Sequence, residues 1–175
     1  MVCVKKRKKP TFLRTVPQNL DNSVAFFGRS KNNFENFNFQ FLIAKLTFHR
    51  YPHIRLGEVP LNTFWIGGYG WFDIYASGIL RKLKREYPNI HIVLVAAYIQ
   101  QLHRGRDNFF DSFDYPAEVE AAPYKLAIPV RNRYMVKNAD YIISYIYREY
   151  GGAYEAVIQA KIYKKVVINL ANEKI

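Results

Sequence analysis

The sequence predicts a doubly wound α/β domain with a mostly parallel sheet of about five strands. Short apolar runs alternate with helical patterns along most of the chain, which is typical of that class. The run over residues 90–96 is continuously apolar, as in a strand covered on both faces. A length of 175 residues, half of them hydrophobic, suits one domain with a buried core. Together these observations favour a single Rossmann-like domain.

Five apolar runs are the expected strands: residues 23–27, 63–66, 90–96, 140–146 and 165–170. Apolar residues at helical spacing predict helices between them: residues 39–49, 71–87, 129–138 and 153–162. Pro52 and Pro88 end the first two helices, and Pro129 suits the start of the third. Residues 98–123 are irregular and polar apart from a short helix at 117–122. We therefore expect them to form the lid or wall of a site.

Net charge divides the chain into two parts. The formal charge is +12, and six Lys and Arg residues lie between positions 5 and 14 with no acid among them. We expect residues 1–22 to form a basic flexible leader and residues 23–175 to form the domain. Such a leader makes weak, non-specific contacts with nucleic acid, or is simply a solvated terminus.

Several classes of protein are excluded by composition. A single cysteine, Cys3, rules out an intrachain disulfide and a cysteine-based zinc site. The four histidines show no metal-ligand grouping, so we expect no metal and no resident cofactor. No apolar run is long enough to span a bilayer, and no apolar segment follows the basic run as in a secretory signal. We therefore expect a cytoplasmic protein without membrane contact.

Glycine follows three of the expected strands, at Gly28, at Gly67, Gly68 and Gly70, and at Gly151 and Gly152. Ligands of open parallel sheets bind beyond the carboxyl ends of the strands. A glycine turn that enters a helix there offers free N–H groups to a phosphate. The spacing matches neither the Walker pattern nor the dinucleotide fingerprint. Each turn therefore predicts either an anion site or a purely structural bend.

Two arginines, Arg131 and Arg133, lie in the helix that follows the polar segment. Arginine binds phosphate or carboxylate through two parallel hydrogen bonds. Residues two apart lie about 200° around a helix from each other, so both cannot face one ligand. We favour Arg131 as the functional one.

Four motifs occur in an order that resembles a known family: Phe26-Phe27-Gly28, residues 66–76, Arg131-Asn132-Arg133-Tyr134-Met135 with Asp140, and Gly151-Gly152-Ala153. This order, which residues 166–170 complete, resembles the SLOG superfamily of Smf/DprA proteins and Lonely Guy enzymes. The likeness covers about residues 23–170 and is greatest to the small stand-alone bacterial proteins similar to YpsA. The resemblance implies a nucleotide pocket over the strand ends, and its best-understood enzymes are phosphoribohydrolases.

Three departures separate this chain from those enzymes. Asn132 stands where they have lysine, although Arg131, Met135 and Asp140 keep the pattern's spacing. Their Pro-Gly-Gly-x-Gly-Thr-x-x-Glu motif is reduced here, and Glu155 stands in a different register. In the first turn Arg29 and Ser30 replace the His-Arg of YpsA-like proteins.

Three functions remain open on the sequence. The first is a binding protein or sensor for a nucleoside monophosphate or an ADP-ribose-like metabolite. Its expected contacts are Gly28, Arg29, Ser30, Gly67, Gly68, Tyr69, Gly70, Asp73, Arg131, Gly151, Gly152 and Ala153. Tyr69, Trp71 or Tyr98 would stack on the base, or else only pack at the rim.

The second function is an N-glycosidic hydrolase acting on a nucleoside monophosphate. It would use Arg131 with a carboxylate, and the candidates are Glu155, Asp73 and Asp114. The third is a nucleic-acid-binding protein that acts through residues 5–14. The family resemblance also implies a homodimer.

Overall fold

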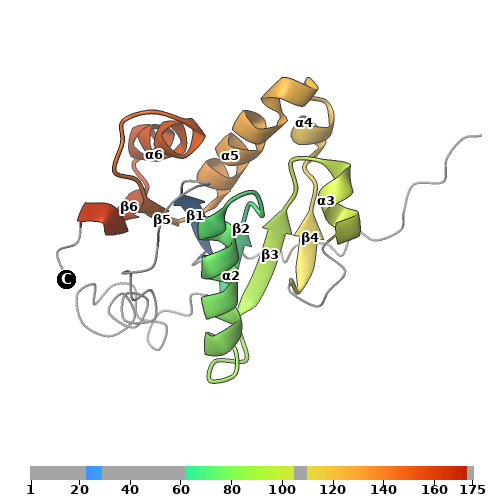
Figure 1. The fold of residues 1–175 in the computed structure, drawn as a ribbon, viewed down its shortest axis with the longest axis vertical. Helices are drawn as coiled ribbons and strands as arrows, with labels where there is room; N and C mark the ends of the chain where they lie inside the picture. Colours follow the sequence, from blue (N-terminus) through green and yellow to red (C-terminus); the bar gives the residue numbers. More distant parts are fainter. Residues whose placement is uncertain (1–22, 29–61, 105–109, 173–175) are drawn as a thin grey trace, which may run out of the picture.

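The computed structural model describes residues 23–28, 62–104 and 110–172, which are coloured in Figure 1. Several sequence predictions fall outside these residues. They are the basic leader over residues 1–22, the helix expected over residues 39–49, and the contacts predicted for Arg29 and Ser30. The structure bears on the remaining elements, which form one sheet and the helices around it.

One six-stranded sheet forms the centre of the domain, one strand more than the sequence indicated. Its strands are β1 (Ser23–Gly28), β2 (Thr63–Ile66), β3 (His91–Val95), β4 (Ser112–Asp114), β5 (Tyr141–Tyr145) and β6 (Val166–Asn169). Their order across the sheet is β4-β3-β2-β1-β5-β6, and every neighbouring pair is parallel. The predicted α/β class and parallel sheet are therefore confirmed.

Helices cover both faces of this sheet. They are α2 (Trp71–Leu83), α3 (Ile99–Arg104), α4 (Ala117–Glu120), α5 (Ala127–Asn138) and α6 (Gly152–Ile162). Figure 1 shows α2 in front of the strands, with α5 and α6 above β1, β5 and β6. The core clusters agree with this view, since α2 packs on one face and α5 and α6 pack on the other. This double covering explains why the central strands are apolar on both sides.

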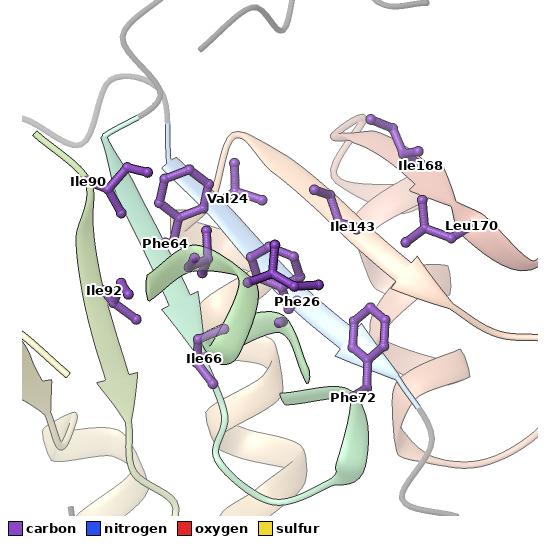
Figure 2. Close-up of a cluster of buried hydrophobic side chains, with 13 residues drawn as sticks. Val24, Phe26, Phe64, Ile66, Phe72, Ile90, Ile92, Ile143, Ile168 and Leu170 are labelled. Atoms are coloured by element: carbon purple, nitrogen blue, oxygen red, sulfur yellow. The ribbon is translucent and has the colours of Figure 1, made fainter. Parts of the chain in front are cut away.

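Alternate residues of the strands other than β4 enter two separate cores. In β1, Val24 and Phe26 pack with α2, whereas Ala25 and Phe27 pack with α5 and α6. Figure 2 shows the first of these cores, in which Phe26 lies among side chains of the neighbouring strands. Phe72, from the first turn of α2, lies in the same figure at the carboxyl end of β1. A side chain at Gly28 would stand 2.2 Å from the Phe72 ring, so this glycine admits the start of α2.

The prediction that residues 98–123 are irregular is wrong at α3 and at β4. Ser112, Phe113 and Asp114 pair with Val93, Leu94 and Val95 of β3 at the edge of the sheet. Three residues at an edge give little apolar pattern, so the sequence showed no strand there. The short helix expected near residue 117 is confirmed as α4.

The chain reverses its direction across the sheet beside β1. Strands β2, β3 and β4 extend to one side of it, and the chain then returns to place β5 and β6 on the other side. Loops from the two halves diverge at such a point and leave a crevice beyond the carboxyl ends of the strands. The crevice here lies over Gly28.

Candidate functional site

A cavity of about 290 Å³ occupies this crevice. Its walls come from the end of β1, the turn between β2 and α2, one face of α5, and the start of α6. Nine of the predicted contacts line it: Gly28, Gly67, Tyr69, Gly70, Asp73, Arg131, Gly151, Gly152 and Ala153. Gly68 belongs to the same turn but does not line the cavity. The structure thus brings together residues that are more than 120 positions apart in the chain.

Arg131 lies in the wall of this cavity, held by α5. Its side chain is only 4% exposed, and its Nη1 donates a hydrogen bond to the Val95 carbonyl over 3.2 Å. Its Nε is buried and has no hydrogen-bond partner. Arg133, two residues along the helix, is exposed, so the helical spacing separates the two arginines as expected.

Gly67 packs directly against the guanidinium of Arg131. A Cβ atom at this position would stand 2.1 Å from Nη1 of Arg131 and 2.7 Å from its Cζ. The guanidinium therefore occupies the space that any other residue would fill. Gly67 serves a contact within the protein, which is the structural alternative that the sequence left open.

In the turn from Gly67 to Gly70, backbone N–H groups donate hydrogen bonds to a side chain of the helix that follows. Oδ2 of Asp73 accepts hydrogen bonds from the N–H groups of Tyr69, at 2.8 Å, and Gly70, at 3.2 Å. Burial raises the pKa of the Asp73 carboxyl, while the Arg131 guanidinium and the N–H groups of the turn oppose that rise. A carboxylate thus already stands where the sequence suggested a phosphate.

The turn before α6 is open by comparison. Gly151 has φ +95°, a conformation that L residues rarely adopt, and α6 starts at Gly152 without a side-chain cap. Gly151, Gly152 and Ala153 all line the cavity. Asn132 of α5 donates from Nδ2 to the Gly152 carbonyl at 3.5 Å. The first N–H groups of this helix have no intrahelical acceptor and lie where an anion could enter.

The two other proposed carboxylates lie outside the cavity. Glu155 is exposed on the first turn of α6, and its N–H bonds the Gly151 carbonyl. Asp114 lies at the end of β4, where burial raises the pKa of its carboxyl and a hydrogen bond with Tyr134 opposes that rise. Of the three carboxylates weighed for hydrolysis, the structure places Asp73 beside Arg131 and the cavity.

Aromatic rings stand at the mouth of the cavity. Tyr69 lines it, the Tyr98 ring lies 5.8 Å from the Tyr69 ring, and the Tyr124 ring lies 4.5 Å from that of Tyr98. Trp71 is exposed on α2 and does not line the cavity. At the opposite side Tyr150 lines it and accepts a 2.7 Å hydrogen bond from Nη1 of Arg148.

Sequence reasoning missed several lining residues, notably Ile128, Asn132 and Met135. They share a signal that was present in the sequence. Counted from Ile128, they and Arg131 stand at i, i+3, i+4 and i+7, so they form one face of α5. Extending the Arg131 position by helical spacing would have found them.

Comparisons with known proteins assign no family or function to this chain. The chain matches no protein-family model and no curated protein sequence. Among the residues that the structure describes, no helix is long and apolar enough to cross a membrane. The same residues hold no group of three or more His, Cys, Asp or Glu side chains able to share a metal ion.

Proposed function

We propose that this cavity binds a nucleotide or a nucleotide-derived metabolite through its phosphate. The observation that carries the proposal is the buried guanidinium of Arg131, which shares the cavity with the uncapped start of α6. Both features favour an anion, one by charge and the other by free N–H groups and the helix dipole.

Burial lowers the pKa of Arg131, and the nearby Asp73 carboxylate only partly opposes that shift. Within the described residues Arg131 forms no ion pair, and its Nε donates no hydrogen bond. Burying a charge that has no ion-pair partner costs several kcal/mol, and a carboxylate nearby offsets only a part of that cost. A bound phosphate would supply the missing acceptor, which explains why the protein would keep this arginine buried beside an open cavity.

The position and size of the cavity support the same ligand class. It lies beyond the carboxyl ends of parallel strands beside the reversal point, where doubly wound domains bind nucleotides. The motif order that resembles the SLOG superfamily leads to the same proposal, and membership of that family is part of it.

Equilibrium dialysis against a mixed panel tests the proposal. The panel contains nucleoside monophosphates, ADP-ribose, NAD and cyclic nucleotides, and both chambers are analysed by chromatography. We expect one class to be enriched intact on the protein side. The Arg131→Gln variant should bind it at least about 30-fold more weakly, as expected for the loss of a buried charge-assisted hydrogen bond.

Arg133→Gln is the matched control, because it removes the same charge from an exposed site on the same helix. It should retain wild-type affinity. Arg131→Met, which fills a similar volume without a charge, guards against a folding defect and is checked by circular dichroism. Unchanged affinity in folded Arg131 variants would contradict the proposal.

A second candidate function is hydrolysis of the bond between base and ribose. The observation that favours it is the Asp73 carboxylate, which lies in the cavity wall with Arg131. A carboxylate there would stabilise positive charge that develops on the sugar as the base departs. Free base in the dialysis chambers, lost in Asp73→Asn but not in Glu155→Gln, would establish this activity.

A further inference from the structure

Three tyrosines form a continuous aromatic surface that starts in the cavity and leads outward. Their rings are separated by 5.8 Å between Tyr69 and Tyr98 and by 4.5 Å between Tyr98 and Tyr124. The Tyr98 hydroxyl donates a hydrogen bond to the Tyr124 carbonyl at 3.2 Å, which ties the outer two together. Even so, Tyr69 is 51% exposed and Tyr124 is 72% exposed. Aromatic area of this extent, held in place yet open, suits a planar ligand group.

The anion end and the aromatic end of the cavity are opposite each other. Tyr69 follows β2, Gly151 follows β5, and β1 lies between these two strands. Two strand spacings amount to about 10 Å. This span is comparable to that between the phosphate and the base of a nucleotide.

The hydrogen bonds between Asp73 and the Gly67–Gly70 turn determine which way the ligand lies. Oδ2 of Asp73 already takes the N–H groups of Tyr69 and Gly70, so a phosphate at that end would meet a carboxylate. The start of α6, at the other end, has no such cap. Arg131 lines the cavity together with both of these ends. A phosphate at α6 therefore directs the rest of the ligand toward Tyr69.

We infer that Tyr69, supported by Tyr98 and Tyr124, is a base-stacking subsite for a nucleotide whose phosphate lies at the start of α6. The inference rests on the proposed function and adds the orientation of the ligand and the group that gives it selectivity. Stacking of a base on an aromatic side chain tolerates any base, because each has a π face. The subsite should thus distinguish nucleotides from sugar phosphates rather than one base from another.

The test compares ligands with and without a base. Dissociation constants are measured for AMP, GMP, CMP and UMP and for ribose 5-phosphate, which retains the sugar and phosphate. Wild-type protein should bind at least one nucleotide about 5- to 100-fold more tightly than ribose 5-phosphate, the range that stacking supplies. Tyr69→Ala should remove most of that advantage and leave ribose 5-phosphate binding within twofold. Tyr69→Phe should retain it.

Tyr150→Ala is the matched control, because Tyr150 lines the cavity at the α6 end. If this variant loses the advantage of the base and Tyr69→Ala does not, the proposed orientation is wrong. If nucleotides and ribose 5-phosphate bind equally, phosphate binding stands and the stacking subsite is refuted. If Tyr69→Ala weakens both ligand types alike, the tyrosine is structural and the subsite is again refuted. If neither ligand type binds, the proposed function fails and the inference fails with it.

Discussion

Two helices, α2 and α6, begin at the same cavity after glycine turns. The backbone N–H groups of the first turn bond to a carboxylate, whereas within the described residues those of the second do not. At α2 the sequence Gly70-Trp71-Phe72-Asp73 places a carboxylate three residues after the cap, and Asp73 takes the turn's N–H groups. At α6 the equivalent residue is Tyr154, which has no carboxylate, and the described part of the chain supplies no side-chain cap there. A glycine-rich turn is therefore not by itself an anion site. The residue three positions into the helix decides whether a carboxylate already accepts the N–H groups of the turn that precedes the helix.

The largest effect on stability should come from a substitution in the Gly67–Gly70 turn, which Asp73 caps. Gly67→Ala places a Cβ atom where Nη1 of Arg131 stands, only 2.1 Å away. The guanidinium is the far end of a flexible side chain, but to move aside it would have to leave its hydrogen bond to the Val95 carbonyl, so we expect a loss of about 1.5–3 kcal/mol. Urea unfolding measures this loss.

The control for this substitution is Gly78→Ala within α2. A Cβ atom at Gly78 meets nothing within 4 Å, so we expect a gain of about 0.5–1 kcal/mol from helix propensity. Equal stability of the two variants would show that Arg131 moves freely and that Gly67 is not required for its placement.

A carboxylate placed at the turn before α6 should weaken anion binding there. Tyr154→Asp gives α6 the cap spacing of α2, so its carboxylate would reach back to the N–H groups of the turn. We expect nucleoside monophosphate affinity to fall by about 30-fold or more, since charge-assisted hydrogen bonds are lost and a like charge is added. The helix itself should gain about 0.5–1 kcal/mol.

Tyr154→Asn supplies a neutral side chain of the same shape as that aspartate. Titration calorimetry should find its loss of affinity smaller than that of Tyr154→Asp. Wild-type affinity in Tyr154→Asp would mean that the phosphate does not lie at α6.

Gly151 should tolerate substitution less well than Gly152, although it has more room. Its φ of +95° strains any L residue, so Gly151→Ala should cost about 2 kcal/mol despite open space around its Cβ position. At Gly152 an added Cβ would make only an ordinary contact, 3.6 Å from Nδ2 of Asn132. Thermal unfolding of the two alanine variants checks this difference, and the reverse order would contradict it.

The smallest effect concerns the charge of the Asp73 cap. Its pKa in the folded protein is raised from the ordinary value of 3.8, mainly by burial. The folded state therefore binds more protons than the unfolded state above pH 3.8. The contribution of this group is present at lower pH and is lost as the pH rises through the folded pKa.

Asp73→Asn keeps an oxygen that can accept the same N–H groups but removes this titration. Wild-type protein should lose stability relative to the variant as the pH rises from about 4 toward neutrality. Urea unfolding across that range gives the two curves. A wild type that instead gains on the variant with rising pH would show that Arg131 and the amides outweigh burial.

Much of the fold can be predicted from short stretches of the sequence. The continuous apolar run that became β3 and the alternation of strands with helices required a parallel sheet covered on both faces. The sequence also predicts the glycines at strand ends and the separation of Arg131 from Arg133 around the helix, because both depend only on neighbouring residues. The cap by Asp73 is local too, since Gly70 and Asp73 are three residues apart.

Tertiary structure alone decided how the site is arranged. Gly67 and Arg131 are 64 residues apart, and only the packing of α5 against the sheet brings the guanidinium over that glycine. β4 exists because β3 offers it an edge, not because Ser112, Phe113 and Asp114 form an apolar pattern. The contact of Asn132 with Gly152 likewise needs α5 beside α6. Sequence periodicity reports which face of an element is buried, whereas the partner that covers it depends on the whole chain.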